Sequence, residues 1–107
     1  TNGGGSGIPI GIESPQNSIP SEFLLQQNYP NPFNPSTNIK FILNKSSNVK
    51  LSIYNVNGKL ENTLTEDFYR EGEYQISWNA VNKPSGIYYC KMEINNGSQV
   101  VKMTLLK

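Results

Sequence analysis

The 107-residue chain has no histidine, a single cysteine (Cys90) and a single aspartate (Asp67). Without histidine, neither a Ser-His-Asp nor a Cys-His arrangement for nucleophilic catalysis can be assembled. One cysteine also excludes an intramolecular disulfide, and Cys90 is predicted to be a small buried hydrophobe. We therefore predict no enzymatic activity and no cofactor.

Strong charge of one sign and long apolar runs are also missing. Nine Lys and Arg residues nearly balance eight Asp and Glu residues, which leaves a net charge of +1 without any basic run. The electrostatic footprint of a nucleic-acid or anionic-membrane binder is therefore absent. No apolar run approaches the roughly 20 residues that a membrane-spanning helix needs. We predict neither a nucleic-acid partner nor a membrane span.

Five of the eight carboxylate side chains cluster in one predicted hairpin region: Glu61, Glu66, Asp67, Glu71 and Glu73. Paired carboxylates can hydrolyse glycosides, but a solvated charged edge explains this cluster better. Glu66 and Asp67 offer oxygen ligands, yet no Ca²⁺-loop spacing surrounds them. No metal site is predicted.

Residues 1–20 have the composition of a linker, with Gly, Ser, Pro, Asn and isolated Ile and no period of 2 or 3.6. The opening TNGGGSG is typical of flexible linkers. The chain begins at Thr1 without a charged-then-apolar leader, so we interpret it as the C-terminal piece of a longer exported precursor. One folded domain is expected over residues 21–107.

From Phe23 onward the sequence changes to short runs in which apolar and polar residues alternate. The runs are residues 23–25, 38–43, 49–54, a weaker one around Leu60 and Leu64, then 74–78, 88–94 and 101–105. Turn signals separate them at Asn57-Gly58, Gly72, residues 83–86 and Asn96-Gly97. Such alternation, with one apolar face, is what a half-solvated antiparallel sheet requires. The sequence predicts an all-β, immunoglobulin-like antiparallel β-sandwich of about seven strands.

Residues 28–37 (NYPNPFNPST) are not ordinary turn sequence. Three prolines fix φ and remove three backbone donors, so this segment cannot be a central strand. We expect an extended, rigid strap whose apolar contacts are Phe33 and Tyr29. Two roles stay open for it: covering one open end of the sandwich, or direct recognition by a partner.

Five blocks of the chain, in order, resemble one known family. They are LLQQNYPNPFNP (24–35), KLSIYNVNG (50–58), Gly72 with YQISWNA (74–80), PSGIYY (84–89) and KMTLLK (102–107). Together they resemble the type A C-terminal sorting domain of the type IX secretion system, found in exported proteins of the Bacteroidetes. The resemblance covers residues 22–107 and departs from the family at Asn44, Glu71 and Cys90, outside the blocks.

The resemblance implies a signal rather than a catalyst. Such domains fold in the periplasm, are recognised by outer-membrane translocon components, and are removed from their N-terminal passenger by a surface sortase-like peptidase. The passenger is then secreted or held at the cell surface. Cleavage is expected within residues 8–22, because an unstructured linker can enter a protease cleft and a paired strand cannot.

The candidate recognition residues lie in the strap, the Gly-x-Tyr block and the terminal block: Pro30, Asn31, Pro32, Phe33, Asn34, Pro35, Gly86, Tyr88, Lys102, Met103, Leu105, Leu106 and Lys107. Tyr88 and Trp78 are expected to face the core, with the Tyr88 hydroxyl bonded to backbone. The terminal strand, residues 100–107, either pairs at a sheet edge with a receptor strand or completes the sheet.

Two other functions remain as alternatives. The fold and the Asn-Pro-Phe-Asn-Pro motif also resemble the immunoglobulin-like part of flagellar hook-capping proteins, which would imply a role in assembly. A carbohydrate-binding or adhesion module would use outward aromatic residues such as Tyr54 and Tyr89.

Overall fold

The computed structural model describes residues 22–95 and 97–107. They form seven strands: β1 (Phe23–Leu25), β2 (Ser36–Leu43), β3 (Ser47–Asn55), β4 (Leu60–Tyr69), β5 (Gly72–Asn79), β6 (Gly86–Ile94) and β7 (Gly97–Leu105). The predicted linker, residues 1–20, lies outside the described residues. No helix of the described part is long and apolar enough to cross a membrane.

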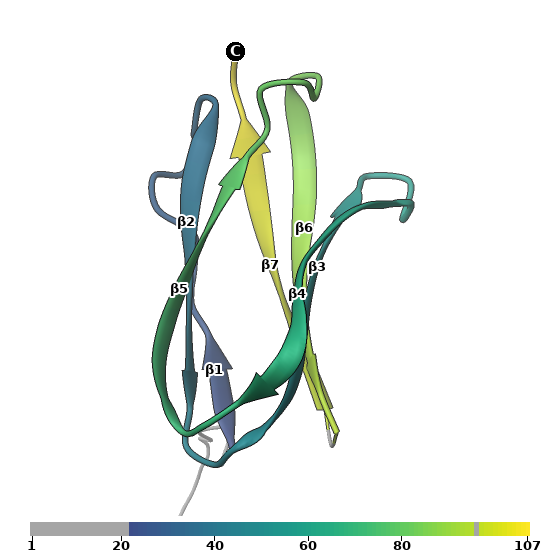
Figure 1. Ribbon diagram of the computed structural model, residues 1–107. Helices are drawn as coiled ribbons and strands as arrows, with labels where there is room; N and C mark the ends of the chain where they lie inside the picture. Colours follow the sequence, from purple (N-terminus) through teal and green to yellow (C-terminus); the bar gives the residue numbers. More distant parts are fainter. Residues whose placement is uncertain (1–21, 96) are drawn as a thin grey trace, which may run out of the picture.

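The strands form two antiparallel sheets, one with the order β1-β2-β5 and the other with the order β4-β3-β6-β7. Figure 1 shows the two sheets facing each other as the layers of a sandwich. The predicted all-β, immunoglobulin-like sandwich is confirmed. Because β4 and β5 belong to different sheets, the acidic residues between Leu60 and Tyr74 do not share one hairpin, and that prediction is wrong. Glu61, Glu66 and Asp67 lie on β4, which forms a hairpin with β3.

The core lies between the inner faces of both sheets, as the alternation predicted. Ile39, Phe41 and Leu43 of β2 are buried, and so are Val49, Leu51 and Ile53 of β3. Each sheet has one apolar face, so each needs the other to remove that face from water. The hydrophobic effect thus selects the two-layer arrangement.

Strand β4 departs most from the prediction. A weak strand was expected around Leu60 and Leu64, yet β4 is a ten-residue strand and the longest of the seven. It lies at the edge of its sheet, and none of its side chains is fully buried. Its register against β3 shifts between Leu51 and Ser52 and again between Ile53 and Tyr54. An edge strand with bulges lacks clean alternation, because few of its side chains have a core to face.

The predicted turns agree with the structure. Gly58 has φ +81°, the conformation that favours glycine, in the turn between β3 and β4. The Asn55 side-chain oxygen accepts hydrogen bonds from the backbone N–H groups of Asn57 (2.9 Å) and Lys59 (3.0 Å) in this turn. The turn predicted at Asn96-Gly97 does connect β6 to β7, with Asn96 itself outside the described residues.

Two aromatic clusters fill the ends of the core. At one end, Phe41 stacks on Tyr74 with ring centroids 5.3 Å apart, and Tyr69 meets both rings edge-on. At the other end, Trp78 contacts Tyr88 at 5.4 Å and Phe33 at 5.7 Å. Such tilted and offset pairs add to the energy gained from apolar burial.

Cys90 lies in β6 with no exposed surface, as predicted. It stands two residues after Tyr88, where antibody domains have a cysteine of their inter-sheet disulfide. Burial raises the pKa of the Cys90 thiol to about 12, so the thiolate that reacts with alkylating agents is scarce in the folded state.

We predict that iodoacetamide modifies the folded protein only at the rate at which Cys90 becomes exposed by unfolding. Labelling at pH about 8 should therefore be slow without denaturant and fast in guanidinium chloride, where the thiol regains its usual pKa. Mass spectrometry measures the modified fraction, and the chain has no second cysteine to confuse it. Rapid complete labelling of folded protein would contradict the buried position.

Candidate recognition site at the C-terminal end

The proline-rich segment forms a closed loop between β1 and β2. Ser36 and Thr37 already belong to β2, so the name proline strap is kept here for residues 28–35. Its base is closed by two backbone hydrogen bonds between Tyr29 and Asn38, at 3.0 and 2.9 Å. Within the loop the backbone bends at residues 30–32 and again at 34–35. The expectation of an extended strap is therefore wrong.

Buried polar side chains fix the shape of the loop. The Asn28 amide donates to the Pro30 carbonyl (3.0 Å) and to the Thr37 hydroxyl (2.9 Å), and that hydroxyl donates to the Pro30 carbonyl (2.8 Å). The Asn28 side-chain oxygen accepts from Gln27, whose amide also donates to the Lys102 carbonyl, both at 2.7 Å. Buried polar groups that are fully hydrogen-bonded specify one conformation. Asn28, Thr37 and Gln27 were not among the residues predicted from sequence.

The tip of the proline strap lies along the outer edge of β7. Phe33 donates its N–H to the Thr104 carbonyl and accepts the N–H of Leu106, both at 3.0 Å. The Asn31 side-chain oxygen accepts the Thr104 N–H at 3.0 Å. The chain's own groups therefore occupy the β7 edge near its end. A receptor strand could pair along this stretch only by displacing the strap.

The two aromatic residues of the proline strap differ sharply. Phe33 is 2% exposed and packs against Trp78, whereas Tyr29 is 79% exposed. The expected apolar contact of Phe33 is confirmed, and that of Tyr29 is wrong because its backbone, not its ring, holds it to β2. Tyr88 is buried as predicted, and its hydroxyl donates to the Pro84 carbonyl at 2.8 Å.

The connection from β5 to β6 meets the strap and the chain terminus. Ala80 donates its N–H to the Pro35 carbonyl at 2.8 Å. The Lys107 N–H donates to the Ser85 hydroxyl at 2.9 Å, and the Lys107 ammonium donates to the Val81 carbonyl at 2.6 Å. In Figure 1 this connection lies beside the C-terminus, at the top of the sandwich. We call the exposed residues gathered here the C-terminal rim: Pro30, Pro32, Asn34, Val81, Leu106 and Lys107.

The candidate recognition residues fall into two groups. Phe33, Tyr88, Met103 and Leu105 are buried in the core, with Tyr88 opposite Met103 and Gly86 opposite Leu105 in the register of β6 and β7. Pro35 and Gly86 are half-buried, and the others are exposed: Pro30, Asn31, Pro32, Asn34, Lys102, Leu106 and Lys107. The structure thus brings most of the predicted residues to one end, but only the exposed ones are accessible to a partner.

An ion pair holds the β5–β6 connection to β4. The Lys83 ammonium lies 2.8 Å from the Glu61 carboxylate, which also accepts a hydrogen bond from the Asn55 amide at 2.9 Å. The bond from Lys83, followed by that from Asn55, lowers the pKa of the Glu61 carboxyl. Burial raises the pKa of the nearby Tyr88 hydroxyl. Glu61 therefore acts as a structural partner of the loop.

Other proposed chemistry finds little support. Tyr54 and Tyr89 are opposite each other on β3 and β6, both half-buried, so they do not form an exposed aromatic platform. Among residues 22–95 and 97–107, no group of three or more Asp, Glu or Cys side chains could hold a metal ion.

The geometry defines a class of molecule: an immunoglobulin-like domain whose strap and terminus meet at one end of the sandwich. The family follows from the sequence, since residues 27–106 match the family described as secretion system C-terminal sorting domain. The chain belongs to this family, whose members are C-terminal signals for type IX secretion and for export to the surface or beyond. A sorting signal of this kind is not itself catalytic.

Among solved structures, the chain is similar to dimeric latent PorU from Porphyromonas gingivalis, with a TM-score of 0.61 and 21% sequence identity. The similarity covers 84% of this chain and 10% of that one, so the chain corresponds to a small part of the larger protein. At this identity the likeness shows a shared fold. No curated protein matches the chain.

Replacing Phe33 should separate the structural role of the strap from recognition. Phe33→Ala is predicted to lower the free energy of unfolding by about 3–5 kcal/mol, because it leaves a cavity beside Trp78. Tyr29→Ala should change it by less than about 0.5 kcal/mol, since that ring is exposed. Urea unfolding followed by Trp78 fluorescence measures both. Equal effects would show that Phe33 does not anchor the strap.

Acid should weaken the Glu61–Lys83 pair. Because the folded pKa of Glu61 is lowered, the pair stabilises the fold above the unfolded pKa and loses this effect as pH falls through the folded pKa. Lys83→Met should return the Glu61 pKa toward its usual value, whereas Lys59→Met should shift it less. An NMR titration of the Glu61 carboxyl checks both. An unchanged pKa in Lys83→Met would contradict the pairing.

Proposed function

We propose that this domain is the folded address label of an N-terminal passenger, and that outer-membrane translocon components recognise it at the C-terminal rim. The observation that supports this is the placement of two family blocks. The strap block and the terminal block are about 70 residues apart in sequence, yet they are hydrogen-bonded through Phe33 and Leu106. A partner that touches the rim therefore contacts both blocks at once, and only when the domain is folded.

The same proposal assigns the steps around recognition. The domain, residues 21–107, folds in the periplasm after export of the precursor, and residues 1–20 link it to the passenger. A surface sortase-like peptidase then cuts within residues 8–22, and the passenger is released or held at the cell surface. In support, the first strand begins at Phe23, so a cut before it leaves every paired strand intact.

The test fuses residues 1–107 to a periplasmic reporter protein in a bacterium with an active type IX system. The reporter is expected outside the cell, without the domain attached, and should stay in the periplasm of a strain lacking the translocon. Retention of the wild-type fusion in the competent strain, with the domain folded, would overturn the proposed function.

The contribution of the rim needs point variants, because deleting residues 102–107 would also remove Met103 and Leu105 from the core. Leu106 is 55% exposed, so Leu106→Glu should leave the melting temperature nearly unchanged while reducing export by about tenfold or more. Leu60→Glu, a matched change at an exposed leucine of β4, should leave export unchanged. Equal export of both variants would remove the rim from the recognition surface.

A further inference from the structure

The four outermost strands of the two sheets differ in how their edges are covered. The β7 edge is occupied near its end by the proline strap. The β1 edge is bonded to one side chain, since the Gln99 amide accepts the Leu25 N–H at 2.8 Å and donates to the Phe23 carbonyl at 3.1 Å. Both edges on this side of the sandwich are therefore engaged by the chain itself. The opposite side has β4 and β5 at its edges.

The outer edge of β4 in its second half is bonded only locally, by the side chain of one of its own residues. Both register shifts lie opposite its first half, whereas residues 65–69 pair regularly with residues 47–51 of β3. The Phe68 N–H donates to the carboxylate of its own neighbour Asp67 at 2.8 Å, so it points away from β3. Because backbone direction alternates along a strand, Glu66 also directs its N–H and carbonyl outward. Among residues 22–95 and 97–107, no other strand pairs with this edge.

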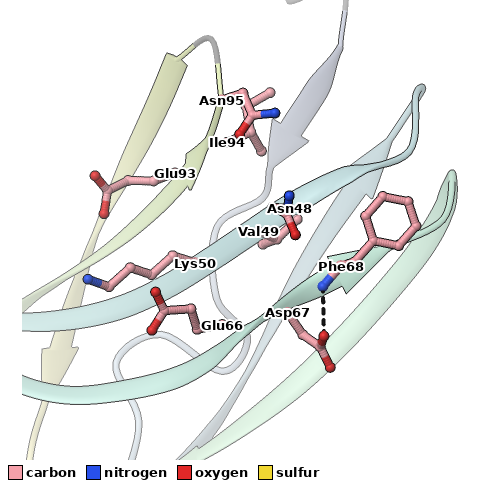
Figure 2. Close-up of a pocket in the computed structure, with 9 residues that line it drawn as sticks. All are labelled: Asn48, Val49, Lys50, Glu66, Asp67, Phe68, Glu93, Ile94 and Asn95. Atoms are coloured by element: carbon pink, nitrogen blue, oxygen red, sulfur yellow. Dashed lines mark hydrogen bonds between the residues drawn. The ribbon is translucent and has the colours of Figure 1, made fainter.

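A hollow of about 480 Å³ lies beside the same stretch, on the outer face of the sheet. Figure 2 shows its lining side chains, with Lys50 between Glu66 and Glu93 and the Phe68 ring at the β4 side. Phe68 is 57% exposed, which is unusual for so large an apolar side chain. The open backbone edge and the hollow thus adjoin each other on β4. Of the two edge strands on this side of the sandwich, β4 is also longer than β5 and offers the longer pairing edge.

The charges of this surface favour one kind of occupant. The outer face of the hollow has two carboxylates, on Glu66 and Glu93, and one ammonium, on Lys50, while the Asp67 side chain lies on the other face of β4, opposite Val49. Glu93 lies 3.8 Å from the Lys91 ammonium, whereas neither Glu66 nor Asp67 has a cation at ion-pair distance among the described residues. A second copy pairing through β4 would bring these carboxylates against each other, and like charges on paired strands repel.

We propose that residues 65–69 of β4 form a docking edge for an extended, basic segment of a partner protein, which adds a strand to the four-stranded sheet. The partner backbone bonds to the outward groups of Glu66 and Phe68 and replaces the Asp67 carboxylate on the Phe68 N–H. Its apolar side chains pack on the Phe68 ring, and its Lys or Arg side chains meet Glu66 on one face of β4 and the released Asp67 carboxylate on the other. In such strand addition the backbone supplies affinity and the side-chain pockets supply specificity. The proposal rests on the function proposed above, because a sorting domain is bound by protein partners.

The direct test uses a synthetic nine-residue peptide that alternates lysine with valine, added to the isotope-labelled full chain. NMR should show shifts centred on residues 65–69 and slower hydrogen exchange at the Glu66 and Phe68 amides. The matched peptide with glutamate in place of lysine should not bind. Affinity for the lysine peptide should fall as salt is added, since the contacts with Glu66 and Asp67 are exposed.

Four substitutions make the test specific. Phe68→Pro removes the outward N–H but no hydrogen bond to β3, and edge strands tolerate such a proline. Because Phe68→Ala also loses the ring but keeps the N–H, the proline variant should bind the peptide about tenfold more weakly than the alanine variant. Glu66→Lys should weaken binding while keeping the backbone intact, which covers the case in which the proline variant fails to fold. Glu73→Lys, an exposed charge on β5, should bind like the wild type.

Several results would overturn the docking edge. One is NMR shifts centred on residues other than 65–69, and another is equal peptide affinity of Phe68→Pro and Phe68→Ala. A third is protection of the Glu66 and Phe68 amides by self-association at high protein concentration, which would make a second copy of the chain the occupant. In the reporter fusion, Glu66→Lys should reduce export about tenfold relative to Glu73→Lys, and equal export would also overturn it. If the wild-type fusion is not exported, the proposed function fails, while the peptide experiment still decides the docking edge.

Discussion

Phe33 is attached twice, by its backbone to β7 and by its ring to Trp78, and the C-terminal end of the sandwich depends on this double attachment. The ring removes apolar surface from water at the end of the core where Trp78 and Tyr88 lie. The backbone bonds cover polar groups of β7 that a partner strand would otherwise reach. With Asn28 and Thr37 fixing the loop behind it, one side chain determines where the exposed residues of the rim lie.

The sequence predicted the strands whose inner face is fully buried and missed the character of β4, whose core contacts, Leu64 and Tyr69, are only partly buried. Val49, Leu51 and Ile53 alternate because β3 is central and half-buried. In β4, Thr65 and Asp67 lie opposite Leu51 and Val49, but an edge position leaves them solvated, so no hydrophobic pattern marks the strand. Bulges shift the period further. Hydrophobic periodicity in a sequence therefore reflects burial, so an edge strand with few buried side chains shows only a weak period.

Two different sequence signals predicted different properties of the candidate site: the family resemblance predicted its location, and the alternation predicted which side chains are buried. The blocks identified the strap and the terminus but did not separate buried members from exposed ones. Alternation does so within β7, where Met103 and Leu105 face inward and Lys102 faces outward. The hydrogen bonds of Asn28 and Thr37 could not be predicted from the sequence. Continuing the alternation of β2 from Ile39 back to Thr37 does, however, place a polar side chain in the core, and such a side chain must have a hydrogen-bond partner. That partner, Asn28, lies nine residues away across the prolines.

The bonds between the strap and β7 also bear on biosynthesis. Phe33 emerges from the ribosome long before Thr104 and Leu106, and until they follow, its N–H and carbonyl lack their partners and one end of the core stays open. A translation product that stops before β7 thus lacks an edge strand of the four-stranded sheet and two of the six rim residues, Leu106 and Lys107. Under the proposed function, a recognition surface formed only from residues at both ends of the domain would be complete in finished chains and incomplete in truncated ones.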